Sequence, residues 1–304
     1  MGGGVAGAEL AAAVSEAGGL GTIGILPAAL LDRVLQRARK LTSRPIAVNL
    51  LLPFTRPEHW DVAARADAVV TFWGAPVRRT SKPWIHQCGS VAEAHAAQVA
   101  GADAVIAQGV QAGGHVRGTL PALRLLEQVR AALPDYPVLL AGGVADAGDV
   151  RAALEAGAAG VVSGTRFLLS DESAAHPDYK RRLIRSDRTV LTGLFGFGWP
   201  APHRVVPNAA TERWLGRDSR GPILVRAAQQ LSAPIGPRLP MSVGDRLARR
   251  AHLSVPLYGP AAPLAGWPEH RLDTAPLYAG ESVARISDIR PAAELVRALA
   301  DGGS

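Results

Sequence analysis

The sequence predicts an α/β fold, a (β/α)8 TIM barrel with an irregular C-terminal extension, and three observations support this prediction. Short apolar runs alternate with helical patterns through the first half of the chain, which is typical of parallel sheets. Several of these runs end in glycine, as expected where the backbone turns at the edge of a sheet. The 304 residues are 48% hydrophobic and 19% charged, which is enough for one barrel of roughly 250 residues and an extension.

The apolar runs define seven strands, which we expect near residues 20, 46, 68, 84, 103, 138 and 160. Helical patterns occupy most connections and several later segments: Ala8–Ala17, Pro27–Leu41, Pro57–Ala66, the segment from the Ser90 cap to Gly101, Pro121–Leu133, Asp146–Ala156, Asp178–Arg185 and Ala292–Ala300. The connection Gly74–Pro83 is too short and too proline-flanked for a full helix.

A barrel needs eight strands, and we expect the first to be the missing one. Gly2–Gly4 resembles the turn that follows a strand, yet the sequence begins there. We therefore expect the first strand to be largely absent, or the start to be truncated or misassigned, with Leu20–Ile25 and Gly160–Val162 left as sheet edges. An open doubly wound sheet would explain seven strands without any loss and stays an alternative.

The alternation of strands and helices breaks down after Leu169. Residues 193–268 are rich in Gly, Pro and Arg, which is typical of ordered but irregular chain. We expect two units, a barrel over residues 1–190 and an extension over residues 191–304 that wraps or covers the barrel mouth.

Composition excludes several classes of partner. The net charge is +7, but the basic clusters have no interleaved aromatic residues, so we predict no nucleic-acid partner. We predict no membrane span, because no run of about 18 apolar residues occurs. A cytoplasmic location is expected from the single cysteine, Cys88, and from the lack of a visible signal peptide. No cluster of residues has metal-ligand spacing, so we predict no metal.

Two glycine-containing turns between residues 137 and 169 predict a phosphate site. The run Val138–Ala141 ends in Gly142-Gly143, and the run Gly160–Val162 is followed by Gly164. Backbone N–H groups can approach an anion closely there because no Cβ intervenes. A short helix from Thr165 would add the partial positive charge of its N-terminus. In (β/α)8 barrels a phosphate site often follows the seventh and eighth strands.

A second candidate is the glycine-rich loop Gln108–Gly118. Gly113-Gly114 would let the backbone pass close to a planar ligand, and His115 follows at the same edge of the sheet. A histidine there can take a proton near neutral pH. The residues alone are equally compatible with a histidine that only stabilises the loop.

Five stretches, taken in order, resemble the nitronate monooxygenase family. They are AVNLLLP around Asn49, IHQCGS, AQGVQAGGHVRG, LLAGGVADAGDV and VVSGTRFLLSDES. The match runs from Met1 to about His176, and FGFGWPAPHRV and LYAGESVARI resemble the C-terminal extensions of bacterial members. The resemblance implies an FMN-dependent oxidoreductase that acts on small alkyl nitronates with O₂ and forms a carbonyl compound and nitrite.

The resemblance also implies roles for individual residues. His115 matches the catalytic histidine that takes a proton from neutral nitroalkane. Gly142-Gly143 and Gly164-Thr165 match the loops around the flavin phosphate. The full set of implied cofactor-binding residues is Met1, Gly2, Asn49, Gln87, Gln108, Gly113, Gly114, Gly142, Gly143, Ser163, Gly164 and Thr165.

Three features depart from the family pattern. Gln111 stands where the family commonly has Glu, Gln87 stands where some members carry Lys, and the first strand is nearly absent. Two alternatives stay open. One is an FMN-dependent enoyl-thioester reductase that uses NADH or NADPH, because that related family shares the glycine-rich histidine loop. The other is a non-catalytic flavin-binding protein.

Overall fold

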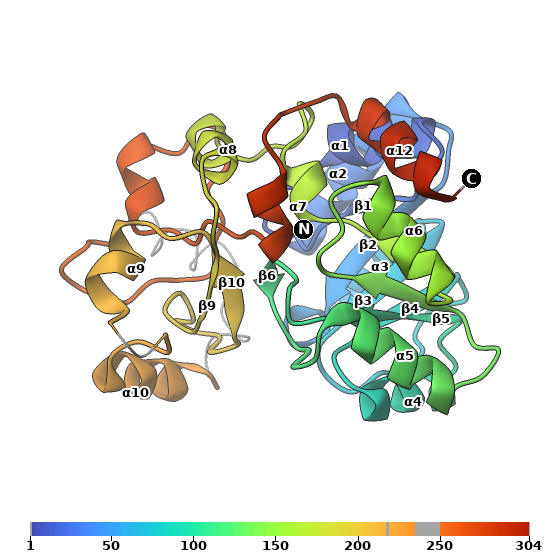
Figure 1. Cartoon of the computed structure of the whole chain (residues 1–304), viewed down its shortest axis with the longest axis horizontal. Coiled ribbons are helices and arrows are strands. Elements are labelled where there is room, and N and C mark those ends of the chain that lie inside the picture. The colour runs from blue at the N-terminus through green and yellow to red at the C-terminus, as the bar shows by residue number, and fades with distance from the viewer. Residues whose placement is uncertain (1, 217–218, 235–249, 304) are drawn as a thin grey trace.

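The computed structural model describes residues 2–216, 219–234 and 250–303. Within these residues, seven parallel strands form one curled sheet, with helices on its outer face (Figure 1). The strands are β1 (Gly21–Ile23), β2 (Ile46–Leu51), β3 (Ala68–Phe72), β4 (Trp84–Cys88), β5 (Ala104–Gln108), β7 (Val138–Ala141) and β8 (Gly160–Val162). Each lies where an apolar run predicted it.

The strand order confirms a barrel that lacks its first strand. The order is β1-β2-β3-β4-β5-β7-β8, so each strand is followed by its neighbour and the order never reverses, as it would in a doubly wound sheet. The two edges are β1 and β8, the edges expected if the first strand is missing. N-terminal residues pair with the chain beyond β1: Gly3 N–H donates to Ile25 O (3.1 Å) and Gly24 N–H to Ala6 O (3.1 Å).

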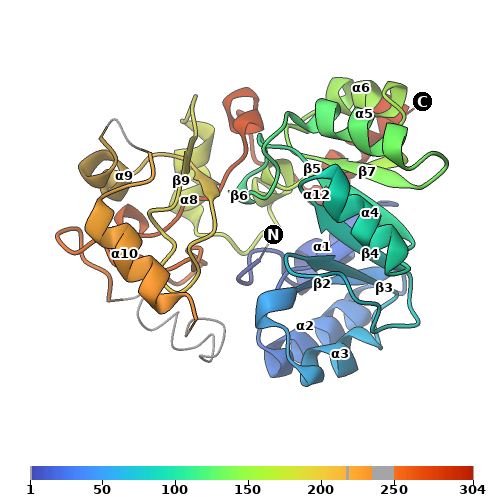
Figure 2. The same ribbon diagram turned by 90° about the horizontal axis from the view of Figure 1, so that it is seen from below.

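The helices lie on the convex side of the sheet (Figure 2). They are α1 (Ala8–Glu16), α2 (Ala28–Leu41), α3 (Pro57–Ala63), α4 (Val91–Val99), α5 (Ala122–Ala132), α6 (Ala147–Glu155) and the short α7 (Thr165–Leu168). The predicted Ser90 cap is present, since its side chain accepts from Glu93 N–H at 3.2 Å. Residues 73–83, all of which the structure describes, contain no helix, as predicted.

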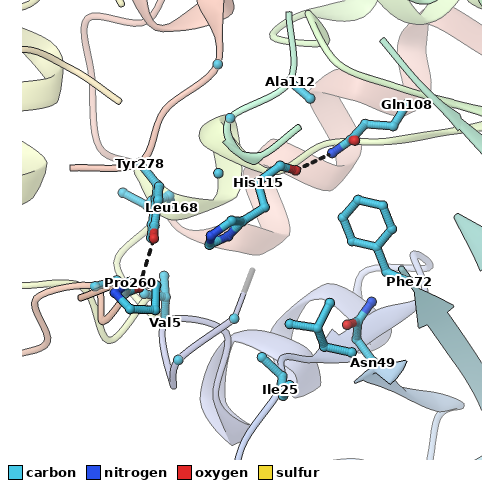
Figure 3. Close-up of a pocket in the computed structure, with 18 of the residues that line it drawn as sticks. Val5, Ile25, Asn49, Phe72, Gln108, Ala112, His115, Leu168, Pro260 and Tyr278 are labelled. Carbon is cyan, nitrogen blue, oxygen red and sulfur yellow. Dashed lines mark hydrogen bonds between the residues drawn. The ribbon is translucent and has the colours of Figure 1, made fainter. Parts of the chain in front are cut away.

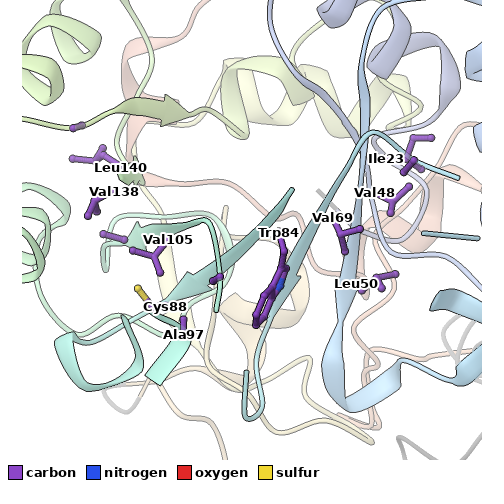
Figure 4. Packing of buried hydrophobic residues seen from close by; sticks show 14 of the residues in the cluster. Ile23, Val48, Leu50, Val69, Trp84, Cys88, Ala97, Val105, Val138 and Leu140 are labelled. Carbon is purple, nitrogen blue, oxygen red and sulfur yellow. The ribbon is translucent and has the colours of Figure 1, made fainter. Parts of the chain in front are cut away.

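Alternating residues on each strand divide the core into two faces. The outer face carries the larger side chains, which pack under the helices, among them Ile23, Val48, Val69, Trp84, Val105 and Leu140 (Figure 4). The inner face carries Ala47, Ala68, Val70, Ile106 and Ala141, with the partly buried Ile85, Leu139 and Val162 packed against them.

His86 and Gln87 point to opposite faces of β4, as predicted for neighbours on a strand. His86 is buried behind the sheet, where its Nδ1 lies 2.8 Å from Thr71 Oγ1. Trp84 Nε1 donates to the same hydroxyl at 2.7 Å. Burial lowers the pKa of His86 to about 4, so it is neutral and structural at pH 7.

The chain after β8 forms short elements joined by irregular segments. They are α8 (Pro177–Ile184), β9 (Val190–Thr192), β10 (His203–Val205), α9 (Ala209–Trp214), α10 (Ile223–Ser232), η3 (Glu269–Asp273), η4 (Glu281–Arg285), α12 (Ala292–Ala300) and η5 (Asp301–Gly303). The extension is joined to the barrel in two places. β10 pairs with both β9 and β6 (Gly114–His115), and α12 returns to pack on α1 and α6. The division into two units at residue 190 stays a prediction.

Candidate active site

A cavity of about 530 Å³ lies at the carboxyl ends of the barrel strands, between the sheet and the extension. Active sites of (β/α)8 barrels occupy this end of the sheet. Four strands contribute lining residues near their ends: Asn49, Phe72, Gln87 and Gln108. Figure 3 shows Asn49, Phe72 and Gln108 of this set. The extension contributes Phe197, Trp199, Pro260, Tyr278, Gly280 and Ser282, among others.

Most of the residues predicted from the sequence meet in this cavity. Those that line it are Gly2, Asn49, Gln87, Gln108, Gly113, Gly114, His115, Gly142, Gly143, Gly164 and Thr165. Ser163 is not among the lining residues; its hydroxyl donates to Val144 O at 3.1 Å. Met1 lies outside the described residues. The assignment of these residues to a cofactor stays a prediction.

Gly142, Gly143 and Gly164, which we call the glycine rim, lie at the ends of β7 and β8. Gly142 and Gly143 have φ of 108° and 87°, a region that favours glycine. A Cβ added at Gly143 would meet nothing within 4 Å, so open space faces this residue. Beside the rim, Thr165 Oγ1 accepts from Gly280 N–H at 2.9 Å, which leaves the hydroxyl proton for a ligand. The rim therefore has the form of an anion cradle.

The two glycines before His115 have different reasons to be glycine. A Cβ at Gly113 would collide with the backbone of Ala279 and Gly280, so Gly113 allows the extension to pack closely on the loop. Gly114 has φ of 73°, and a Cβ there would meet nothing within 4 Å. Both glycines line the cavity, and the space in the direction of a Cβ is open only at Gly114.

Gln108 fixes the loop that carries His115. Its Nε2 donates to His115 O at 2.9 Å (Figure 3), and its Oε1 accepts from Arg117 N–H at 2.9 Å. Gln111, the residue that replaces the family's Glu, accepts from Ala122 N–H at 2.9 Å through its side chain. An amide can make this helix-start contact as a carboxylate would.

His115 lies at the centre of the cavity with its ring among other rings (Figure 3). Its centroid is 3.9 Å from that of Trp199, 5.4 Å from His203 and 5.5 Å from Tyr278. The Nε2 atom is buried and has no hydrogen-bond partner among the described residues. Burial, with a smaller effect from His203, holds the pKa of His115 well below its usual value, so the imidazole is neutral at pH 7.

His203 is fixed as one neutral tautomer. Its Nε2 accepts from Phe195 N–H at 3.2 Å, so the proton lies on Nδ1, which is 2.9 Å from Ala201 O. Burial lowers its pKa to about 4. These contacts fit the role of a loop-stabilising histidine, with both ring nitrogens engaged.

No lysine, arginine, aspartate or glutamate belongs to the cavity lining in the part of the chain that the structure describes. The titratable lining groups are His115, Tyr179 and Tyr278, and burial raises the pKa of both tyrosines. Tyr179 donates to Tyr278 O at 2.6 Å and Tyr278 to Pro260 O at 2.8 Å. The lining formed by the described residues is therefore uncharged at pH 7. Among the described residues, no group of three or more His, Cys, Asp or Glu side chains could hold a metal ion.

The sequence analysis missed the aromatic and C-terminal residues of the cavity. They are Phe54, Phe72, Tyr179, Phe197, Trp199, Tyr278, Gly280 and Ser282. Two stretches that resemble the family's C-terminal extensions, FGFGWPAPHRV and LYAGESVARI, contain five of these residues and were the available signal.

The comparison with protein families decides the membership of the chain. The model of the nitronate monooxygenase family matches residues 1–81 and 78–302, which is nearly the whole length. The chain belongs to the nitronate monooxygenase family. Members of this family are flavoenzymes and oxidoreductases, so the resemblance seen in the sequence is confirmed.

Two curated relatives match at the same level of identity. Nitronate monooxygenase from Pseudomonas aeruginosa is 35% identical over 252 residues, with 62% of this chain and 71% of the relative covered. The second is a dehydrogenase from Rhodococcus jostii that is named for a hydroxy-methyl-oxo-octahydroindene carboxyl-CoA. It is 35% identical over 216 residues, with 66% of this chain and 60% of the relative covered. The matches thus span only part of either relative.

Two solved structures superpose on almost the whole chain. FabK from Thermotoga maritima has a TM-score of 0.76 at 28% identity and covers 98% of this chain and 89% of its own. Nitroalkane oxidase from Streptomyces ansochromogenes has a TM-score of 0.76 at 29% identity, and the match covers 99% of this chain and 92% of the oxidase. Both similarities confirm the fold and extend across the C-terminal extension.

Proposed function

We propose that this chain binds FMN and oxidises alkyl nitronates with O₂ to a carbonyl compound and nitrite. The observation that carries the proposal is that the glycine rim shares one cavity with His115, whose Nε2 has no hydrogen-bond partner among the described residues. Family membership supports the reaction class, as do the names of the Pseudomonas relative and the Streptomyces nitroalkane oxidase.

The residues present fit FMN. Gly143 and Gly164 would face the phosphate, and the Thr165 hydroxyl would donate to it. The neutral amides of Asn49 and Gln87 would hydrogen-bond the polar edge of the isoalloxazine, while apolar neighbours exclude water. Bound flavin would supply electron transfer and the reaction with O₂; the protein would supply binding, orientation and a base.

His115 would act as the base toward neutral nitroalkane. Its imidazole is neutral at pH 7, so Nε2 can take the proton from the carbon that bears the nitro group. The electron pair of the broken C–H bond then resides on the nitro group, which makes the nitronate. Overall, two nitronates and one O₂ would give two carbonyl groups and two nitrite ions, so each oxygen atom of O₂ replaces the nitrogen at one carbon.

A nitrite assay tests this proposal. The purified 304-residue chain is loaded with FMN and mixed in air with nitroethane or its preformed nitronate. We expect nitrite in proportion to the O₂ consumed, without any nicotinamide. A yellow, folded protein that forms no nitrite from either compound would overturn the proposal.

An enoyl-thioester reductase is the second candidate, favoured by the similarity to FabK and to the carboxyl-CoA dehydrogenase. It would oxidise NADH or NADPH when a 2-enoyl thioester is added and would leave nitronate unchanged. Nicotinamide oxidation that depends on the thioester separates this candidate from the nitronate reaction. A non-catalytic flavin-binding protein would give flavin binding with neither activity.

A further inference from the structure

Trp199 belongs to the extension, yet its ring lies among three loops of the barrel. It is stacked on His115, with ring centroids 3.9 Å apart and an interplanar angle of 28°. It also makes edge contacts with Phe54 and Trp73, each with a centroid distance of 5.3 Å. These partners follow β5, β2 and β3, so one indole connects three loops at the cavity mouth.

The backbone around Trp199 is held by hydrogen bonds on both sides. Gly198 N–H donates to Ser232 Oγ of α10 at 3.0 Å, and Phe197 N–H donates to Tyr258 O at 3.0 Å. Trp199 N–H donates to Gly196 O at 3.0 Å and closes a turn. Gly198 has φ of 81°, which this turn requires. The position of the indole is therefore set by the fold of the extension.

The stack restricts access to His115. Trp199 covers one face of the imidazole and is itself part of the cavity lining. Nε2 is buried in this arrangement. A molecule that reaches Nε2 from the cavity must therefore fit beside the indole or displace it.

We propose that Trp199 sets the size of the substrate that reaches His115 and positions the imidazole as a buried neutral base. The claim that Trp199 limits substrate size rests on the proposed function, in which the substrate is a nitroalkane. The claim that Trp199 positions the imidazole rests only on the ring stack. Short nitroalkanes fit beside the indole, and those with a bulky aryl group are excluded.

Few charged groups can affect the titration of His115. His203 on β10 is neutral at pH 7, and the Tyr278 hydroxyl donates to Pro260 O. Arg117 lies 4.7 Å from the Trp73 ring centroid, beyond the indole, and its Nε donates to Glu93 at 2.6 Å. Removal of the indole admits water, weakens the desolvation of the imidazole and raises the pKa of His115 toward its ordinary value.

Two variants of the full chain test the proposal, Trp199→Ala and the ring-retaining control Trp199→Phe. The first measurement is the ratio of kcat/KM for 1-nitro-2-phenylethane to that for nitroethane. We expect Trp199→Ala to raise this ratio about tenfold and Trp199→Phe to change it less. The second measurement is the NMR titration of the His115 ring, which needs no activity. We expect a higher pKa in Trp199→Ala and a wild-type value in Trp199→Phe.

The two claims fail in distinguishable ways. An unchanged ratio and an unchanged His115 titration in folded Trp199→Ala would overturn the proposal. If wild type oxidises neither nitroalkane, the proposed function fails, and the titration still decides the positioning claim. If Trp199→Ala does not fold, Trp199→Leu, which keeps an apolar side chain but no ring, takes its place with the same expected shifts.

Discussion

His115 has a buried Nε2 without a hydrogen-bond partner in the described part of the chain, and its pKa is held well below its usual value. We predict that His115→Ala keeps bound flavin but oxidises neutral nitroalkane ~10²–10⁴-fold more slowly, the usual contribution of a general base. The rate of oxidation of preformed nitronate, which needs no proton removal, should fall less. Steady-state rates with both forms check this, and equal losses on the two would contradict the role of base.

In the wild type, the lowered pKa of His115 should keep the rate with neutral nitroalkane constant until the pH falls well below 6.5.

Gly164 offers a clean test of the phosphate site because its φ is −108° and ψ −63°, values open to any residue. A side chain there adds bulk without the backbone strain that Gly143, with φ of 87°, would suffer. We predict that Gly164→Val folds but is purified without flavin. Flavin absorbance and circular dichroism of the purified protein are the measurements. A variant that keeps full flavin content at unchanged stability would remove Gly164 from the site.

At the level of elements, η4 is tied to the glycine rim through Arg285. The guanidinium donates to Gly143 O at 2.8 Å and pairs with Asp146 at 2.7 Å and Asp149 at 2.8 Å. Because the C=O and N–H of a trans peptide point in opposite directions, this contact directs the Val144 N–H away from Arg285. The guanidinium is half-exposed, so its effect on stability should be small.

We predict that Arg285→Ala raises the Kd for FMN about two- to tenfold with little change in melting temperature. The matched control is Arg124→Ala, which removes an exposed pair with Glu127 far from the cavity. Fluorescence titration of the flavin-free proteins with FMN gives the Kd of each variant and of the wild type. Equal affinities for wild type and Arg285→Ala would show that η4 does not position the rim.

The sequence predicted elements and loops far better than contacts between distant segments. The strand–glycine turns at Gly142-Gly143 and Gly164 were predictable because apolar runs and glycines are local signals. The stack of Trp199 on His115 was not, since it depends on how β10 pairs with β6. Gly113 lines the cavity as predicted for a ligand-facing residue, but its close approach to the backbone of the extension is a contact that no local pattern reveals.

For the whole molecule, buried neutral histidines predict a loss of stability in mild acid. His86 and His203 have pKa values lowered to about 4, against about 6.5 in the unfolded chain. Between these values the unfolded chain binds protons that the folded chain does not, so the free energy of unfolding falls as the pH drops from 6.5 toward 4. The effect is ~3 kcal/mol per histidine at most. Urea unfolding at about pH 7 and about pH 5 checks this, and equal midpoints would contradict it.

The central claim is that the cavity between barrel and extension holds flavin beside a nitronate. Its most direct test is to mix the FMN-loaded chain with ethyl nitronate in the absence of O₂ and follow the flavin absorbance. We predict that the oxidised flavin absorbance is lost and that it returns, with nitrite, when air is admitted. Flavin that stays oxidised with nitronate, but is reduced by NADPH and reoxidised by a 2-enoyl thioester, would contradict the claim.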